Sequence, residues 1–307
     1  MQDDKTLLRV IYIGGIEHNG STLLGLTLGN HSQIECIGEL SQLPRLGWAG
    51  DHLCACGKTI TDCEYWNNVR KTWSGSTGED IEVLIAGENR FDRNSSFLRL
   101  LLENNVQSQA FQKYSSQTKA LYEAIQQVSG KPIIVDTSKR VSRAVALSLI
   151  DGIDLRLIHL VRDARAVAYS SAKTKRAQQK SWWKSAARWR AINESFHIAS
   201  RVVGKDKKIL IRYEDFIEKP DQTLAKIGHF IGVNLTSISK VLSSGGALAP
   251  GHIGIGNGFL QGEKEIILRP SENWPEKMSI QEQRKVWKIT VGRMRLYGYE
   301  EEAVKPK

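Results

Sequence analysis

A glycine-rich turn near the N-terminus carries the residue types needed to bind a phosphate-like anion. Residues 14–22 read GGIEHNGST and follow a short apolar run. A turn of this kind between a strand and a helix directs several backbone N–H groups into one concavity, and the helix dipole adds about half a positive charge. We therefore predict an anion site that contains His18, Asn19, Gly20, Ser21 and Thr22.

The same turn departs from the ATP-binding P-loop at one position. Residues 15–22 fit most of the pattern G-x-x-x-x-G-K-[ST], but Ser21 replaces the lysine. That lysine reaches the outer phosphates in ATP-using enzymes, so phosphoryl transfer from ATP is disfavoured. A P-loop nucleotide kinase stays an alternative function, and a basic nucleic-acid binding protein is another.

A second group of chemically useful residues follows a later apolar run. Residues 157–161 read LIHLV, Arg162 comes next, and Ser170 lies eight residues further on. Ligands of open α/β sheets bind at the carboxyl ends of the strands, where an arginine can hold a phosphate with two parallel hydrogen bonds. Arg162 and Ser170 are thus candidates for a second phosphate, although each alone also fits an ordinary surface position.

The elements that must position these residues alternate along the chain. Apolar, β-branched runs predict strands at residues 7–13, 34–37, 132–136, 155–161 and 208–212. Helical spacing predicts helices at residues 21–28, 142–150 and 279–297, and others that begin at residue 164 and near residue 220. Residues 67–130 also have helical spacing, interrupted by a turn at 74–78. Residues 243–262 show no clear element. Alternating strands and helices predict an α/β fold with a P-loop-like central parallel sheet flanked by helices. We expect residues 1–307 to form a single domain.

Composition narrows the function classes. The chain has 307 residues, is 41% hydrophobic and carries a formal charge of +10, which favours an anionic ligand. A core of this size does not need metals or disulfides for stability. No apolar run approaches the length of a transmembrane helix, and the N-terminus lacks the features of a signal peptide. We expect a cytoplasmic protein that does not bind membranes.

The cysteines allow two interpretations. Cys54, Cys56 and Cys63 cluster near His52, and three thiolates with an imidazole could bind zinc. The spacing is Cys-x-Cys instead of the usual Cys-x-x-Cys, so a loop with partly buried, reduced thiols is the preferred interpretation. No metal is assigned.

Together these motifs resemble the sulfotransferases, which use 3′-phosphoadenosine 5′-phosphosulfate as donor. The first loop of that family typically reads Arg-Ser-Gly-Thr-Thr or Arg-Ser-Gly-Ser-Thr and holds the 5′-phosphosulfate, and here it reads HNGST. By resemblance, Arg162 and Ser170 hold the 3′-phosphate, Tyr213 of the run IRYEDF lies near the nucleotide, and a loop with Gly256 and Asn257 closes over the 3′-phosphate. The segment CACG at 54–57, with Cys63 and Trp66, also resembles bacterial members of the group.

The resemblance implies a metal-independent sulfuryl transfer with three catalytic residues. Tyrosylprotein-type members carry a glutamate base in a Gly-Glu pair after the second strand, which implies Glu39 as general base here. Lys139 resembles a lysine or serine that contacts the donor in relatives. His18 replaces the basic residue of the family's loop, and a bound dianion is expected to raise its pKa, so activity should depend on pH. His31 and His52 are rival bases, and we interpret His31 as structural.

The acceptor side has no motif. Residues 173–190 mix Lys and Arg with Trp182, Trp183 and Trp189, a pattern that fits nucleic-acid binding or an acceptor pocket. The preferred interpretation is an amphipathic helix with buried tryptophans and solvated charges. We expect a small-molecule acceptor, of the kind found in secondary metabolism, and no nucleic-acid partner.

Overall fold

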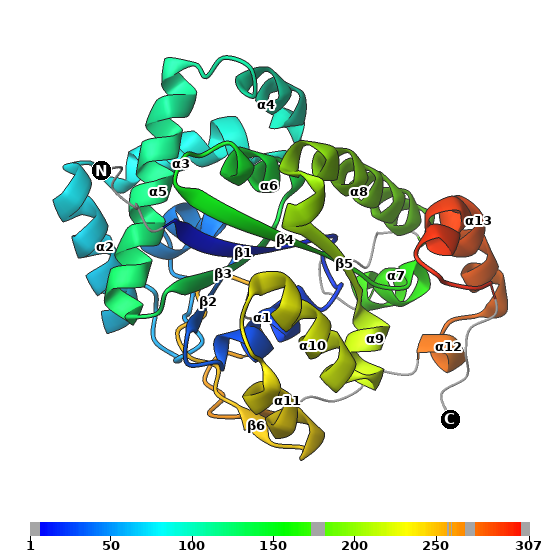
Figure 1. Ribbon diagram of the computed structural model, residues 1–307. Helices are drawn as coiled ribbons and strands as arrows, with labels where there is room; N and C mark the ends of the chain where they lie inside the picture. The colour runs from blue at the N-terminus through cyan, green and yellow to red at the C-terminus, as the bar shows by residue number, and fades with distance from the viewer. Residues whose placement is uncertain (1–6, 173–181, 257, 259, 268–273, 302–307) are drawn as a thin grey trace.

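The computed structural model describes residues 7–172, 182–256, 258, 260–267 and 274–301. Five parallel strands form its central sheet in the order β2-β3-β1-β4-β5 (Figure 1). The strands are β1 (Leu8–Gly14), β2 (Ile34–Gly38), β3 (Ile133–Lys139), β4 (Ile153–Val161) and β5 (Lys208–Arg212). The expected α/β fold with a central parallel sheet is thereby confirmed.

Helices cover both faces of this sheet (Figure 1). One face carries α2 (Glu64–Thr77), α5 (Gln109–Ser129), α6 (Val141–Ser148) and α8 (Trp182–Val203). The other carries α1 (Ser21–Gly29), α9 (Tyr213–Glu218), α10 (Pro220–Ile231) and α11 (Thr236–Ser243). Smaller helices are α3 (Ile81–Gly87) and α4 (Phe97–Glu103). Helices α7 (Ala164–Ala172) and α13 (Ile280–Leu296) pack beside α8, and α12 (Trp274–Lys277) packs on α7. The short strands β6 (Ala247–Leu248) and β7 (Ile266–Ile267) pair antiparallel.

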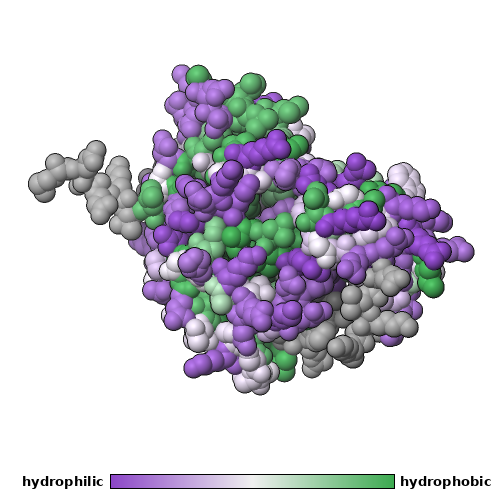
Figure 2. Space-filling view, turned by 45° about the vertical axis from the view of Figure 1, so that its right-hand side comes forward, coloured by the Kyte–Doolittle hydropathy of each residue, from purple (hydrophilic) through white to green (hydrophobic). Residues whose placement is uncertain are grey.

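The strands are apolar on both sides because both faces are buried. In β1, Val10 and Tyr12 belong to the core cluster under α2, α5 and α6, while Ile11 and Ile13 belong to the cluster under α1 and α10. Alternate residues of a strand point to opposite faces, so a continuous apolar run is what a sheet covered twice requires. Hydrophilic side chains cover most of the outer surface seen in Figure 2.

One expected break in the chain is misplaced. The predicted turn at residues 74–78 lies inside α2, which continues to Thr77 and ends at Gly78, whose φ is 68°. The hydroxyls of Ser76 and Thr77 each donate to the carbonyl of the buried Trp73 at 2.9 Å. These bonds hold the polar residues within the helix, and only the glycine ends it.

The helices can be compared with the length and apolar character that a membrane-spanning helix needs. None of those in the described ranges is long and apolar enough to span a bilayer.

Candidate functional site

All five strands of the sheet end at the same edge, and each is followed by a predicted site residue. The glycine-rich loop follows β1, Glu39 follows β2, Lys139 ends β3, Arg162 follows β4 and Tyr213 follows β5. Parallel strands bring their carboxyl ends together, so residues far apart in sequence meet at one site. A cavity of about 500 Å³ lies here, lined by Glu17, His18, Gly20, Ser21, Thr22, Leu23, Glu39, Lys139, Arg162, Tyr213, Gly256, Ile266 and Ile267.

The side chain of Asn19 braces the loop from beneath. It is fully buried, its Nδ2 donates to the carbonyl of Leu160 at 2.9 Å, and its Oδ1 accepts from the backbone N–H of Ser21 at 3.0 Å. Asn19 therefore ties the loop after β1 to β4, and its side chain is not part of the cavity wall. The N-cap residue of α1 is Gly20, whose φ of +93° suits glycine.

The turn forms a narrow cradle at the start of α1. A Cβ on Gly20 would lie 2.3 Å from the Tyr213 ring, so only glycine fits there. The Ser21 hydroxyl is buried and, among the residues that the structure describes, has no hydrogen-bond partner. The free N–H groups of a helix N-terminus need acceptors from outside the helix. A buried hydroxyl without a partner at that point fits an anion that supplies one.

Arg162 closes one side of this cradle. Its Nη1 donates to the carbonyl of His18 at 2.8 Å, and its guanidinium carbon lies 4.4 Å from the centre of the Tyr213 ring. His18 itself has a φ of 67°, an uncommon left-handed conformation for a residue with a side chain. The contacts hold Arg162, Tyr213 and the loop backbone together.

Glu39 and Lys139 form an ion pair in the wall of the same cavity. Their side chains are only 15% and 12% exposed, and Gln42 also donates to the Glu39 carboxylate. A Cβ on Gly256 would lie 2.6 Å from Glu39 Oε1, and the Gly256 carbonyl accepts from the Thr22 hydroxyl at 3.1 Å. Residues near 256 thus connect the carboxylate to the glycine-rich loop.

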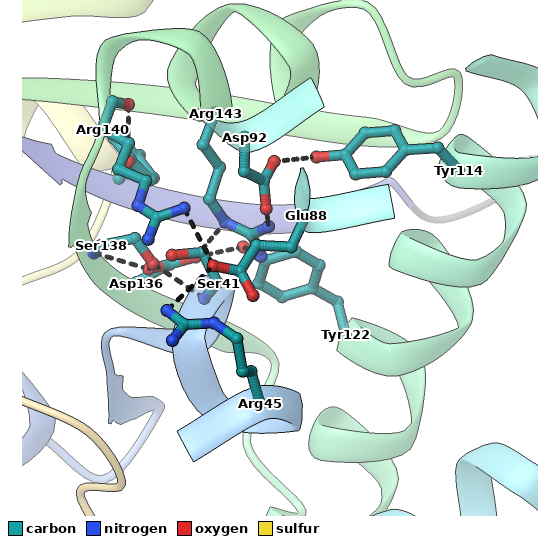
Figure 3. Close-up of polar contacts among 11 residues, drawn as sticks. Ser41, Arg45, Glu88, Asp92, Tyr114, Tyr122, Asp136, Ser138, Arg140 and Arg143 are labelled. Atoms are coloured by element: carbon teal, nitrogen blue, oxygen red, sulfur yellow. Dashed lines mark hydrogen bonds and ion pairs between the residues drawn. The ribbon is translucent and has the colours of Figure 1, made fainter. Parts of the chain in front are cut away.

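A buried polar network surrounds Asp136 near the ends of β2 and β3 (Figure 3). Asp136 of β3 accepts from Arg143 Nε at 2.9 Å and from the Ser138 N–H at 2.8 Å. The Ser138 hydroxyl accepts from the Ser41 N–H at 3.1 Å. Asp136 therefore fixes the ends of β2 and β3, the two strands that present Glu39 and Lys139.

The strand end after β5 is anchored by a buried carboxylate. Glu214 accepts from the Asp163 N–H at 3.0 Å and from the Tyr299 hydroxyl at 2.7 Å. Burial raises the pKa of Glu214, while the hydrogen bonds from Asp163 and Tyr299 oppose the rise. These contacts position the neighbouring Tyr213 against Gly20.

Ser170, like Asn19, is a predicted donor contact that does not line the cavity. Ser170 lies half-buried on α7, and Asn257 is outside the described residues. Glu17, Leu23, Ile266 and Ile267 line the cavity without having been predicted. Glu17 and Leu23 adjoin the predicted loop, whereas Ile266 and Ile267 come from a segment with no recognisable motif.

The rival histidines have other surroundings. The Nε2 of His31 lies 3.1 Å from the Asn234 carbonyl, and its Nδ1 accepts from the Gln33 N–H at 3.2 Å, which fits the structural role expected for it.

The histidine beside the cysteines is not His52. His252, far away in sequence, joins Cys54, Cys56 and Cys63. Closeness in sequence led to His52, but a distant segment of the chain folds back and brings His252 to the cysteines.

The tryptophan-rich helix fits the amphipathic interpretation only in part. Trp189 of α8 is fully buried and donates to the Arg162 carbonyl at 3.0 Å, but Trp183 is 57% exposed. The basic residues at 173–180 lie outside the described residues.

A separate surface hollow of about 790 Å³ lies between α10 and α11. It shares no lining residue with the candidate site.

The comparisons with known proteins agree with this geometry. The model of the sulfotransferase family matches residues 10–237. The protein-tyrosine sulfotransferase of Drosophila melanogaster is 23% identical over 228 residues, which are 73% of this chain but only 38% of that protein. The chain therefore spans well under half the length of this relative.

A solved structure shares the fold. The sulfotransferase domain from the olefin synthase of Synechococcus PCC 7002 matches with a TM-score of 0.55 and 19% identity, covering 97% of each chain. The sulfotransferase domain from the curacin biosynthetic pathway matches with a TM-score of 0.49 and 16% identity, over 96% of this chain and 99% of that one. From the family match over most of its length, the chain belongs to the sulfotransferase family.

Proposed function

We propose that residues 1–307 act as one catalytic domain that transfers a sulfuryl group from 3′-phosphoadenosine 5′-phosphosulfate to a hydroxyl or amine of a small-molecule acceptor. The observation that carries the proposal is a cavity lined by both the glycine-rich loop and the Glu39–Lys139 pair. Anion binding and proton removal would then take place within one space.

The donor would bind along the strand ends. The buried Ser21 hydroxyl, the hydroxyl of Thr22 and the backbone N–H groups at the start of α1 suit the 5′-phosphosulfate. Arg162, with Ser170 and the segment of Gly256 and Asn257, would hold the 3′-phosphate, and Tyr213 would face the nucleotide. Bound at these residues, the donor supplies the sulfuryl group and a stable bisphosphate leaving group.

The chain's own residues would then handle the proton and the charge. Glu39 would accept the proton of the acceptor hydroxyl or amine, which makes the acceptor oxygen or nitrogen nucleophilic. Lys139 and His18 would face the charge that develops on the bridging oxygen, beside the preorganised N–H groups of the loop. This arrangement needs no metal in the reaction itself.

A small acceptor fits the size of the site. A cavity of about 500 Å³ that also admits the sulfate end of the donor leaves space for a metabolite-sized group. Ile266 and Ile267 give it an apolar wall. One similar structure is a domain of an olefin synthase, and one relative is named a protein-tyrosine sulfotransferase. Acceptor trials should therefore include small hydroxylated metabolites and tyrosyl peptides.

Ligand-dependent thermal unfolding tests the donor. Adenosine 3′,5′-bisphosphate, ATP with magnesium, and single-stranded DNA are compared at equal concentration. We expect the bisphosphate alone to stabilise strongly, by about 2.7 kcal/mol at 100 times its Kd. Stabilisation by ATP with magnesium but not by the bisphosphate would instead indicate a P-loop kinase, and stabilisation by DNA alone a nucleic-acid binding protein.

A further inference from the structure

Four side chains with metal-binding atoms meet beside the end of β2. Cys54, Cys56, Cys63 and His252 each offer one ligand atom, and these four atoms all lie within 4.8 Å of one another. Two of the cysteines are fully buried, and His252 is half-buried. The group comes from two segments almost two hundred residues apart, so the fold, and not local sequence, assembles it.

The spacing of the atoms matches a tetrahedron around zinc. Zn–S bonds of about 2.3 Å and Zn–N bonds of about 2.05 Å place sulfur atoms about 3.8 Å apart and sulfur and nitrogen about 3.6 Å apart. Cys63 Sγ lies 3.8 Å from both Cys54 Sγ and Cys56 Sγ. His252 Nδ1 lies 3.4 Å from Cys63 Sγ and 3.9 Å from Cys54 Sγ. These four separations fit one central ion.

The surrounding structure orients the four ligands. The N–H of Cys54 donates to the Lys58 carbonyl at 2.8 Å and its carbonyl accepts from the Gly57 N–H at 2.9 Å, which forms a tight turn around Cys56. Cys63 is the N-cap residue of α2, at the helix end that carries partial positive charge. The Tyr65 ring stacks on the His252 imidazole with centroids 5.0 Å apart.

A second contact fixes the histidine from its backbone. The indole Nε1 of Trp66 donates to the His252 carbonyl at 2.9 Å. Outer contacts of this kind hold ligands of metal sites in place.

We propose that Cys54, Cys56, Cys63 and His252 bind one structural zinc ion. Three thiolates and one imidazole complete a four-coordinate site with no open position, which is the arrangement of structural and not catalytic zinc. A disulfide would join only two of the three sulfur atoms and would leave the third beside them. The nearly equal separations instead indicate a shared central cation.

The ion would tie a distant segment to the proposed active site. The residues after His252 run back along β2: the Gly254 N–H donates to the Ile37 carbonyl at 3.1 Å, and the Ile255 carbonyl accepts from the Glu39 N–H at 2.9 Å. Gly256 then contacts the Glu39 carboxylate and Thr22. Zinc therefore anchors one end of the segment that closes over Glu39.

Metal analysis of the purified full chain tests the site. We expect about one zinc ion per chain after dialysis against metal-free buffer. Cys63→Ser and His252→Gln should lose the ion. Two matched controls should keep it: His52→Gln removes the histidine nearest in sequence, and Cys36→Ser removes a buried cysteine outside the group.

A second measurement covers variants that do not fold. Wild-type protein stripped with a chelator and reloaded with Co²⁺ should show the thiolate charge-transfer and visible bands of tetrahedral cobalt. The proposal is overturned by a folded wild-type chain that contains no zinc and gives no such cobalt spectrum. It is also overturned by a non-reduced mass two hydrogens lighter, which would show a disulfide in the group, or by zinc that the His252→Gln variant retains in full while His52→Gln loses it.

Discussion

The ion pair of Glu39 and Lys139 is the residue-scale feature on which the proposed chemistry depends. Both side chains are largely withdrawn from solvent and face the cavity. In the free protein the two charges satisfy each other. We infer that a bound donor draws Lys139 toward its sulfate and leaves the Glu39 carboxylate to the acceptor.

Replacing Glu39 by glutamine tests its role as the base. Glu39→Gln keeps the shape of the side chain and removes the group that accepts the proton, so kcat should fall by about 10²–10⁴-fold. Binding of the bisphosphate, followed by thermal unfolding, should stay unchanged. Glu35→Gln is the matched control, because Glu35 lies on β2, just before Glu39, but pairs with Lys131 at 2.8 Å and does not line the cavity. A Glu39→Gln enzyme with native turnover would remove Glu39 from the mechanism.

Replacing His18 by arginine tests the charge at the loop. A histidine near a bound dianion is charged at low pH and loses its charge as the pH rises. The native enzyme should therefore lose activity toward high pH more steeply than His18→Arg, which keeps its charge throughout. His18→Gln, with no charge at any pH, should be slow and without this limb in kcat/KM. Identical profiles for the native and arginine forms would contradict a catalytic charge on His18.

At the scale of elements, the buried Arg143 network holds the strand ends that carry the site. Arg143 donates to Asp136 at 2.9 Å, to Asp92 at 2.6 Å and to the Tyr122 hydroxyl at 3.1 Å, and its side chain is 4% exposed (Figure 3). Burial raises the pKa of Asp92, and the nearby charge of Arg143 opposes that rise. The positive charge of Arg143 thus offsets the cost of burying the carboxylates of Asp92 and Asp136.

Removing that guanidinium should cost much of the protein's stability. Arg143→Ala leaves Asp92 and Asp136 buried without their cation, so the free energy of unfolding in urea should fall by about 3–5 kcal/mol. Arg70→Ala is the control, because Arg70 and Asp80 form a pair with side chains 38% and 74% exposed. That pair should contribute less than about 1 kcal/mol. Similar losses in the two variants would show that the network does not support the sheet.

The sequence predicts the sheet well because its strands are buried on both faces. The β5 boundaries at Lys208 and Arg212 match the prediction, and the other strands differ by a few residues at their ends. Residues that directly follow these strands could be placed in one site, since parallel strands share an edge. The continuation of α2 through Ser76 and Thr77 was not predictable from composition, because side-chain bonds to the preceding turn decide it.

At the scale of the whole molecule, the contacts that sequence missed are those made by distant segments without motifs. His252 meets the cysteines through the long return of the chain, and Ile266 with Ile267 enters the cavity wall from the same C-terminal region. Nearness in sequence favoured His52 instead. The Asp136–Arg143 pair was equally hidden, since a strand aspartate and a helix arginine look like ordinary surface charges until their burial is known.

The free energy of unfolding should depend on pH because the imidazole of His159 is buried. His159 of β4 is buried between Phe196 and Tyr297, and its Nε2 lies 2.9 Å from Asn193 Oδ1. Burial is the main cause that lowers the pKa of His159 to about 4; the hydrogen bond to Asn193 opposes this shift, and the charges of Arg293 and His197 add to it. An unfolded histidine has a pKa of about 6.5, so acid protonates the unfolded chain first.

Acidification should therefore destabilise the fold through His159. Between about pH 6.5 and 4 the unfolded state binds the extra proton, so the free energy of unfolding falls as pH falls, by about 3 kcal/mol from this group. The loss is absent above about pH 6.5, where both states are neutral. His159→Gln cannot titrate, so its urea unfolding should show a shallower decline over that range than wild type. His229→Gln, which removes an exposed histidine, should keep the wild-type slope. Equal slopes in all three proteins would mean that His159 is charged within the fold or that water reaches it.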